Sequence, residues 1–361
     1  MVKAQSATPA LKHLRRARPI IGLIGRRTLG SLAAIVGASI VVFILLRLVP
    51  GNPARAVLGQ FASDQAVESL TNSMGLNEPI YVQYYRYVAD FLRGDWGVSY
   101  STGEAVMTQM TSRLPATLEL ALAAFALAFG AAVVLALLST YRRRPWLDGS
   151  ARGVAAFGLG TPPFWIGLVL LVVFSEYVPF FPGPEGRLSS GVEPPPKVTG
   201  LYTVDALIAL NPSTFLDAVW HLVLPAVALG LAPFAFLMRL LRANLRDVAG
   251  EPFILVVRSK GVSRWKTFVR HALPNAFLPT LTAGGLVLGQ LVAGSVLVEK
   301  VYNWPGVGTL VTNGILQQDY SVLQTFILLT AVVYIGLNLI VDVVSGMVDP
   351  RVRTGSVDTL G

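Results

Sequence analysis

Residues that could carry out catalysis are few and scattered in this 361-residue sequence. It contains no cysteine, and its three histidines, His13, His221 and His271, are far apart along the chain. A thiol nucleophile, a disulfide and a zinc–thiolate site are therefore excluded. The HExxH, GxSxG and Walker A patterns are also absent. The sequence thus predicts no catalytic site, no metal site and no ATP hydrolysis by this chain.

A proton or sodium-ion relay would need carboxylates inside apolar segments. Glu119, Glu176 and Asp342 are the candidates, and each lies near an end of its apolar segment rather than at its centre. The simplest interpretation is that each side chain reaches an interface or pairs with a neighbouring helix. An ion-coupled secondary transporter, with Glu119 as its relay, stays open as an alternative.

The elements that hold these groups are predicted to be membrane-spanning helices. The chain is 53% hydrophobic and only 14% charged, whereas soluble domains average about 25% charged residues. A span takes roughly 20 apolar residues. Six segments are long enough: 28–49, 115–139, 153–178, 219–241, 276–298 and 322–345. The first is too long for the apolar region of a signal peptide. Pro162 and Pro163 predict that the third is kinked or partly outside the bilayer.

The distribution of charge sets the predicted orientation. Of the 29 Lys and Arg, 21 lie in 1–27, 140–152, 239–271 and 349–361, which hold only 5 of the 20 Asp and Glu. Basic connections stay on the cytoplasmic side, so both termini are predicted to be cytoplasmic. Topology accounts for the net charge of +9, and nucleic acid is not needed as a partner.

The predicted organisation is a helical membrane protein with one external insertion. It comprises an N-terminal tail (1–27), a first span (28–49), an external segment (50–114), a core of five spans (115–345) and a C-terminal tail (346–361). Within 50–114, Asn77-Glu78-Pro79 predicts a helix start and Gly94 its end. Tyr81, Tyr84 and Tyr85 recur on this helix, which fits either an interfacial aromatic face or a docking surface.

The connection at 242–275 is much longer than a turn between two spans requires. Glu251-Pro252 predicts a helix start, and Gly261 permits a left-handed bend. After Gly261, an apolar face of Val262, Trp265, Phe268, Val269 and Ala272 opposes a polar face containing Arg264, Lys266 and Arg270. Two short helices meeting at Gly261 are predicted. An apolar face with a basic rim suits anionic lipid and a protein partner equally well.

Small and polar residues mark the last two spans. Gly285, Gly289 and Ala293 form a four-residue repeat that permits close helix approach, within the chain or against another subunit. Gln290 lies beside that face, and Asn338 lies in the sixth span. Both amides should hydrogen-bond between helices or border a wet cavity.

Several ordered motifs resemble one protein family. The stretch VVRSKGVSRWKTFVRHALPNAFLP resembles the EAA loop of permease subunits in binding-protein-dependent ABC importers, most closely the B-type subunits of dipeptide, oligopeptide and nickel importers. The other matching motifs, in chain order, are FILLRLVPGNPA (43–54), RGDWGVSY (93–100), RLPATLEL (113–120), TPPFW (161–165), HLVLPAVALG (221–230), EKVYNWPGVGTL (299–310) and NLIVDVVSGMVDPRVR (338–353). Pro252, Val257 and Ser259 depart from the usual loop pattern.

The resemblance implies the type I ABC importer permease fold, with N-in and C-in topology, in a bacterial cytoplasmic membrane. It implies a homologous second permease subunit, two ATP-binding subunits that hold ATP and Mg²⁺, and an external solute-binding protein. Peptides are the expected cargo, with nickel or another small solute as the alternative. The residues expected to couple to the ATPase are Glu251, Ser259, Lys260, Gly261, Arg264, Trp265, Phe268 and Val269.

Overall fold

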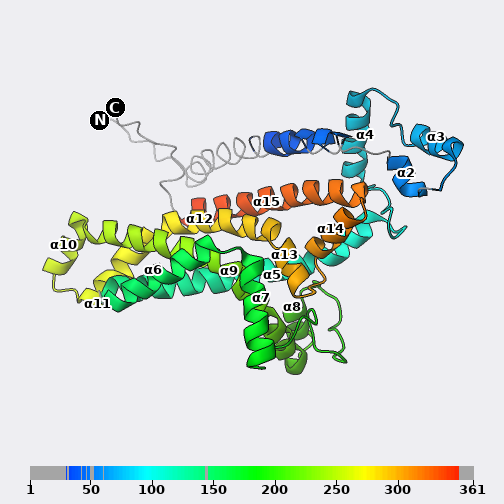
Figure 1. The fold of residues 1–361 in the computed structure, drawn as a ribbon. Helices are drawn as coiled ribbons and strands as arrows, with labels where there is room; N and C mark the ends of the chain where they lie inside the picture. Colours follow the sequence, from blue (N-terminus) through cyan, green and yellow to red (C-terminus); the bar gives the residue numbers. More distant parts are fainter. Residues whose placement is uncertain are drawn as a thin grey trace, which may run out of the picture.

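The computed structural model describes residues 30–348 except 31, 42, 46, 49–52, 60, 143 and 144. The predicted tail 1–27 and residues 349–361 lie outside the described residues. The described part is helical, and its β-structure is limited to one isolated bridge between Val98 and Ala105 (Figure 1). The prediction of an all-α protein is confirmed.

Helices of very different length succeed one another along the chain. An apolar helical stretch, Leu32–Leu45, comes first. It is followed by α2 (Pro53–Leu58), α3 (Asp64–Ser73), α4 (Ile80–Arg93), α5 (Val106–Arg142), α6 (Pro145–Gly160), α7 (Pro163–Leu171), the π-helical segment η1 (Val172–Tyr177), α8 (Tyr202–Ile208) and α9 (Pro212–Ala249). The remaining elements are α10 (Pro252–Ser259), α11 (Arg264–Thr267), the π-helical segment η2 (Phe268–Ala272), α12 (Leu273–Gly294), α13 (Val296–Val301), α14 (Val307–Leu316) and α15 (Tyr320–Val348).

Four helical stretches among the described residues are long and apolar enough to cross a membrane: Val106–Tyr141, Pro212–Ala249, Arg264–Gly294 and Tyr320–Val341. They contain most of the second, fourth, fifth and sixth predicted spans, and they run side by side as a bundle (Figure 1). Three of them begin well before the predicted spans, at Val106, Pro212 and Arg264, because their first turns contain polar residues.

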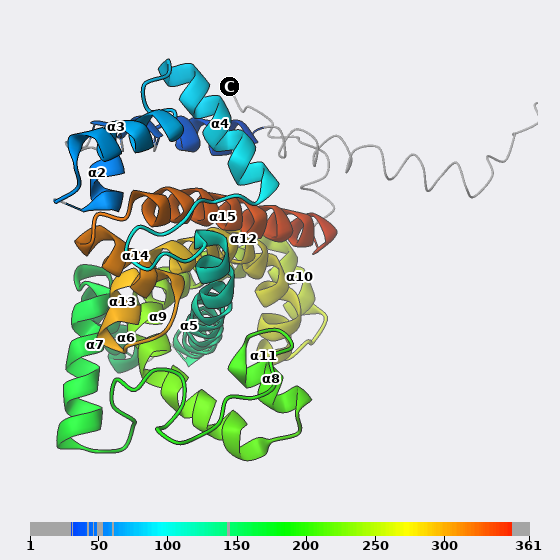
Figure 2. The ribbon, with the colours of Figure 1, turned by 90° about the vertical axis from the view of Figure 1, so that its right-hand side faces the viewer.

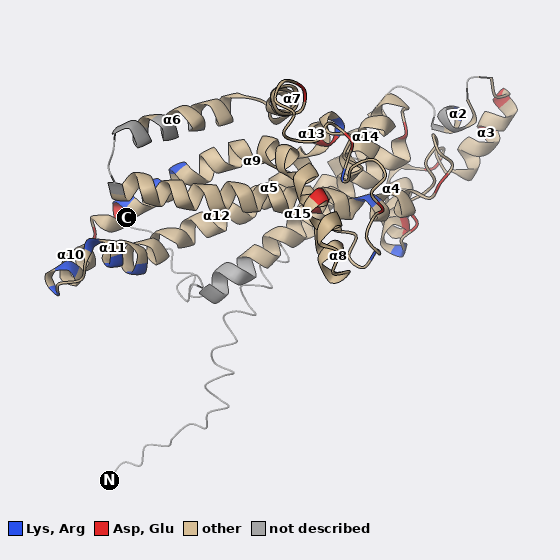
Figure 3. Ribbon diagram, turned by 90° about the horizontal axis from the view of Figure 1, so that it is seen from below, with Lys and Arg blue, Asp and Glu red and all other residues tan. Residues whose placement is uncertain are grey.

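The third predicted span, 153–178, does not form one continuous helix. It breaks after Gly160, where Pro162 adopts an extended conformation (φ −61°, ψ 136°) in front of Pro163, the first residue of α7. A residue before proline is pushed out of the helical region. As a result α6 lies along the bundle and α7 runs across it (Figures 1 and 3). The predicted alternatives were a kink and a partial exit from the bilayer. The structure shows a sharp turn at Thr161-Pro162, which corresponds to the kink.

The core of the bundle is the contact between α5 and α9. Along α5, every fourth residue from Ala124 to Ala136 is a buried alanine. A side-chain Cβ added to Gly230 of α9 would lie 2.8 Å from the carbonyl oxygen of Ala124. Small residues on both helices therefore allow their backbones to approach closely.

The predicted insertion caps one side of this bundle. Viewed along the bundle, α2, α3 and α4 form a layer over α15, while α7 and α8 lie on the other side (Figure 2). The predicted bounds of the aromatic helix are confirmed, since Pro79 precedes α4 and Gly94 ends it in a left-handed conformation (φ 83°).

Candidate functional site

The connection between α9 and α12 forms one end of the bundle, which we call the loop end. Lys and Arg gather there on α10 and α11, whereas most described Asp and Glu lie toward the opposite end (Figure 3). The charge separation read from the sequence is thus a separation in space. The opposite end of the bundle is called the far end below.

The first half of the loop is a regular short helix. Glu251 precedes α10, and Pro252 occupies its first turn, where its missing N–H costs no hydrogen bond. The hydroxyl of Ser259 donates to the carbonyl oxygen of Val256 (2.9 Å) and closes the last turn. The departures from the usual loop pattern at Pro252 and Ser259 are therefore compatible with a helix.

Gly261 makes the turn between the two halves. Its φ is +80°, and its N–H donates to the carbonyl oxygen of Arg258 (3.0 Å). No atom lies within 4 Å of the position that a Cβ would take. The requirement for glycine here is thus conformational rather than steric, because a left-handed backbone is unfavourable for residues with a Cβ.

The second half of the loop is continuous with a long helix. Ser263 caps α11 by accepting a hydrogen bond from the backbone N–H of Lys266 (3.5 Å). The helix then passes through η2 into α12, so that Arg264–Gly294 forms one 31-residue stretch. The predicted second short helix is therefore the first part of this stretch, which continues into the predicted fifth span. A force on Arg264 or Trp265 would act directly on that span.

The predicted coupling residues divide into two groups. Glu251, Ser259, Lys260, Gly261, Arg264 and Trp265 are exposed, and Val269 is half-buried. Phe268 differs from the prediction of an outward apolar contact, because it is buried in the core and packs against the ring of Tyr141 (centroids 6.1 Å apart). Phe268 is the first residue of η2 and directly follows the buried Thr267 at the end of α11.

Sequence reasoning missed the end of α5 and the apolar side of α10. Tyr141 contacts the rings of Trp265 (5.0 Å between centroids) and Phe268, and the Arg264 guanidinium lies 5.3 Å from its ring centroid. On α10, Leu255 and Val256 are 64% and 53% exposed. The continuous apolar run FILVV (253–257) could have indicated this surface in the sequence. Apolar residues that are exposed together on a charged surface mark a contact site.

Glu119 is fixed in an ion pair. Its carboxylate contacts the Arg187 guanidinium (2.5 Å) and accepts hydrogen bonds from the N–H and hydroxyl of Thr203 (2.8 and 2.7 Å). Arg187 also donates to the carbonyl oxygen of Gly200 and lies over the ring of Tyr202 (3.4 Å). Both charges are buried. The arrangement attaches the segment between η1 and α9 to α5. It favours the interpretation that Glu119 pairs with a neighbouring segment.

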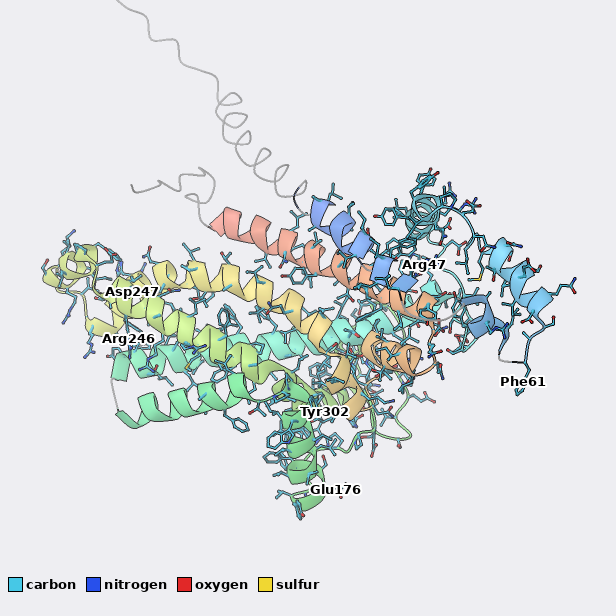
Figure 4. The ribbon with its side chains drawn as sticks, turned by 45° about the horizontal axis from the view of Figure 1, so that its top comes forward. Arg47, Phe61, Glu176, Arg246, Asp247 and Tyr302 are labelled. Carbon is cyan, nitrogen blue, oxygen red and sulfur yellow. The ribbon has the colours of Figure 1, made fainter. Side chains whose placement is uncertain are left out.

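The other two candidate relay carboxylates are placed differently. Glu176 is exposed at the tip of η1, pointing away from the bundle (Figure 4). The side chain of Asp342 lies outside the described residues.

Tyr302, which is labelled in Figure 4, connects α13 to α7. Its hydroxyl donates a hydrogen bond to the carbonyl oxygen of Gly167 (3.0 Å).

Two further buried carboxylates order the far end. Glu299 accepts hydrogen bonds from the hydroxyls of Thr117 (2.7 Å) and Ser295 (2.8 Å), and its burial raises its pKa above the usual value. Asp205 accepts from the backbone of Val198, Thr199 and Gly200. Burial opposes ionisation of Asp205, but these hydrogen bonds outweigh it and hold its pKa below the usual value.

The small residues of α12 face α15 within the same chain. A Cβ on Gly285 would clash with the side chain of Val341, and one on Gly289 would lie 2.6 Å from the Tyr334 ring. Asn338 lies on the same face of α15 by helical spacing, and its Oδ1 is buried without a hydrogen-bond partner in the described part of the chain. Gln290 is exposed on another face and borders a cavity of about 380 Å³ between α6, α9 and α12.

The aromatic helix α4 presents fewer free rings than the sequence suggested. The hydroxyls of Tyr84 and Ser39 hydrogen-bond (2.7 Å), and Trp96 stacks on Phe91 (5.1 Å between centroids). The outward rings are those of Tyr81 and Tyr85, each 72% exposed. Among the described residues, no group of three or more histidine and carboxylate side chains could hold a metal ion.

A bundle of long apolar helices joined by a basic loop indicates a multi-pass membrane protein. The chain matches the family described as binding-protein-dependent transport system inner membrane component over residues 128–354, and the N-terminal region of such components over 20–121. It belongs to this family of ABC importer permeases.

Relatives align with nearly the whole chain. The probable D,D-dipeptide transport system permease protein of Escherichia coli (strain K12) is 38% identical over 92% of this chain and 98% of its own length. The di/tripeptide transport system permease protein of Pseudomonas aeruginosa (strain UCBPP-PA14) is 36% identical over 92% and 99%. The glutathione transport system permease protein of Escherichia coli (strain K12) is 31% identical over the same shares.

Proposed function

We propose that this chain is the membrane-spanning subunit of an ATP-driven importer of short peptides. It forms half of the translocation pathway together with a homologous permease chain. Two separate subunits bind ATP and Mg²⁺, and an external solute-binding protein delivers the cargo. The relatives support a short-peptide cargo, because permeases of dipeptide, D,D-dipeptide and di/tripeptide transport systems align with 91–92% of this chain.

The observation that carries the proposal is the construction of the loop end. An exposed element with an apolar face (Leu255, Val256, Trp265) and a basic rim (Lys260, Arg264) joins α9 and α12 without a flexible linker. Closure of the ATP-binding subunits would push this element as a rigid body. Because α11 and α12 are one helix, the push would tilt α12 and the α15 packed on it, and so change which side of the membrane the pathway opens to.

The orientation proposed is N-in and C-in with six spans in a bacterial cytoplasmic membrane. The four long apolar stretches supply four spans, while Leu32–Leu45 and α6 supply the first and third. The concentration of Lys and Arg at the loop end supports its cytoplasmic placement. Gln290 is assigned to the pathway, because an exposed amide beside a cavity at membrane depth suits hydrogen bonding to a passing peptide.

Reconstitution tests this function. The complete importer in proteoliposomes, supplied with its binding protein and a labelled dipeptide, should accumulate the dipeptide only when ATP is present on the loop-end side. Uptake of Ni²⁺ but not of peptide would reassign the cargo to the alternative. Peptide uptake driven by an ion gradient without ATP would instead establish a secondary transporter.

A further inference from the structure

A pocket of about 320 Å³ opens at the loop end, between the last turn of α5 and the two halves of the loop. Its polar wall includes Thr140, Arg258, Arg264 and Thr267, and its apolar wall includes Ile254, Phe268 and Ala272. Its volume falls at the lower end of the range for small-molecule pockets, roughly 300–1,000 Å³. The fold has thus placed two guanidinium groups and a hydroxyl around one concave, partly apolar space.

The two arginines are not neutralised by carboxylates of the described chain. The close ion pairs of the described residues involve other arginines, among them Arg55, Arg86 and Arg187. Arg264 donates to the carbonyl oxygen of Tyr141 (3.3 Å), which fixes it at the rim of the pocket and leaves its charge uncompensated. Arg258, the next charge along the wall, comes from α10, on the other side of Gly261.

Thr140 supplies a third group suited to an anion. Its Oγ1 is buried and has no hydrogen-bond partner in the described part of the chain. Buried hydroxyls are normally satisfied by protein or ordered water, so the Thr140 hydroxyl in the pocket wall still has a hydrogen bond to make. A hydroxyl donor beside two guanidinium groups matches the oxygens of a phosphate, which arginine binds in a bidentate manner.

The position of the pocket favours a phosphate that belongs to a lipid. The apolar stretch of α5 ends at Tyr141, and the half-exposed Trp265 packs on that ring. Tyrosine and tryptophan mark the headgroup level of a membrane. Ile254 and Phe268 then offer an apolar surface directly beside the charged wall, where the glycerol and first methylenes of a lipid would lie.

We propose that this pocket binds the phosphate headgroup of an anionic phospholipid of the cytoplasmic leaflet, held by Arg258, Arg264 and the Thr140 hydroxyl. Basic pockets between helices on the cytoplasmic side are suited to such headgroups. The site rests on the proposed orientation of the loop end. Because its walls come from α5, α10 and α11, a bound headgroup connects α5 to the coupling loop and makes coupling dependent on anionic lipid.

The test measures lipid retention by the complete importer in nanodiscs that contain phosphatidylcholine with or without phosphatidylglycerol. Native mass spectrometry should detect retained phosphatidylglycerol on the wild type. Arg258→Gln should lower the apparent affinity about five- to tenfold, since each basic group near an anionic lipid contributes on the order of 1 kcal/mol and a directly bound one more. Thr140→Val should lower it less. Arg270→Gln, which removes an exposed charge of the same loop outside the pocket, should leave it unchanged.

Three results would overturn the proposal. Equal losses in Arg258→Gln and Arg270→Gln would show non-specific surface attraction. Binding of inorganic phosphate at millimolar concentration that displaces no lipid would assign the pocket to a free anion. Loss of the ATP-binding subunits from Arg258→Gln with unchanged lipid retention would assign it to an acidic protein contact. Retention is measured without transport, so a failed peptide-uptake assay would not affect this outcome.

Discussion

Replacement of Gly261 tests whether the geometry of the loop, rather than its charge, transmits the effect of ATP. The residue lies at φ +80° between α10 and α11, and the space around its missing Cβ is empty. Gly261→Ala therefore introduces no steric clash. Gly261→Val adds a β-branched side chain, which the left-handed region tolerates least.

The magnitude follows from the backbone alone. A residue with a Cβ in the left-handed conformation costs about 1–2 kcal/mol, which corresponds to roughly a five- to thirtyfold shift in a two-state equilibrium. The ratio of loops that leave the observed turn to loops that keep it should rise by this factor, and leaving the turn would change the angle between α10 and α11. The long helices on either side do not depend on this turn, so insertion and total helix content should remain.

The assay is ATP hydrolysis by the reconstituted importer, stimulated by the loaded binding protein. Gly261→Ala should reduce stimulation by up to about five- to thirtyfold, and Gly261→Val further. Gly103→Ala is the matched control, since Gly103 has φ +73° and equally open space but lies far from the loop. It should carry the same backbone cost without loss of stimulation. Normal stimulation in Gly261→Val, with the protein at wild-type levels in the membrane, would refute the proposal that the loop moves as a rigid body.

Three further predictions concern the buried charges and the helix contacts. Glu119→Gln should lower the free energy of unfolding by about 3–5 kcal/mol, because it leaves Arg187 buried without a counter-charge; thermal unfolding should show that Glu119→Gln with Arg187→Met costs less than the single change. The folded-state pKa of Asp205 is lowered, so its contribution to folding stability is present above the unfolded-state pKa of about 3.9 and is lost as the pH falls through the folded-state pKa. Hydrogen exchange of the 198–200 amides, corrected for intrinsic rates, should show protection at pH 5 that disappears in stronger acid. A wild-type exchange pattern in Asp205→Ala would contradict this prediction. Gly289→Leu should destabilise the contact with Tyr334 by roughly 1–3 kcal/mol through overpacking, and Gly294→Leu, where the space is open, should not.

Local patterns in the sequence predicted local structure well. Pro79 and Gly94 bounded α4, Pro252 began α10, and Gly261 took the left-handed turn. In each case the backbone chemistry of one residue decides the conformation, so neighbouring residues are sufficient information. The long apolar helices followed from hydropathy for the same reason.

Contacts between distant segments could not be read in this way. Glu119 was visible as a carboxylate near a helix end, but its partner Arg187 lies 68 positions away in a loop rich in proline and glycine. Phe268 and Trp265 share an apolar face on an ideal helical wheel, yet Phe268 is buried and Trp265 is exposed, and both pack on Tyr141 of the distant α5. The pocket at the loop end is formed by α5, α10 and α11 together, so it cannot be predicted from the sequence of any one of these segments.

Site-specific crosslinking from the loop tests the central claim most directly. Because the natural chain has no cysteine, a single cysteine can be introduced at Lys260 in the loop or, as a control, at the exposed Leu316 on α14 at the far end. In membranes that contain the complete importer, Lys260→Cys should form a crosslink to an ATP-binding subunit whose yield changes when ATP is added, and Leu316→Cys should form none. A crosslink to that subunit from Leu316→Cys, or its absence from Lys260→Cys and from neighbouring loop positions, would contradict the assignment of this loop as the coupling element.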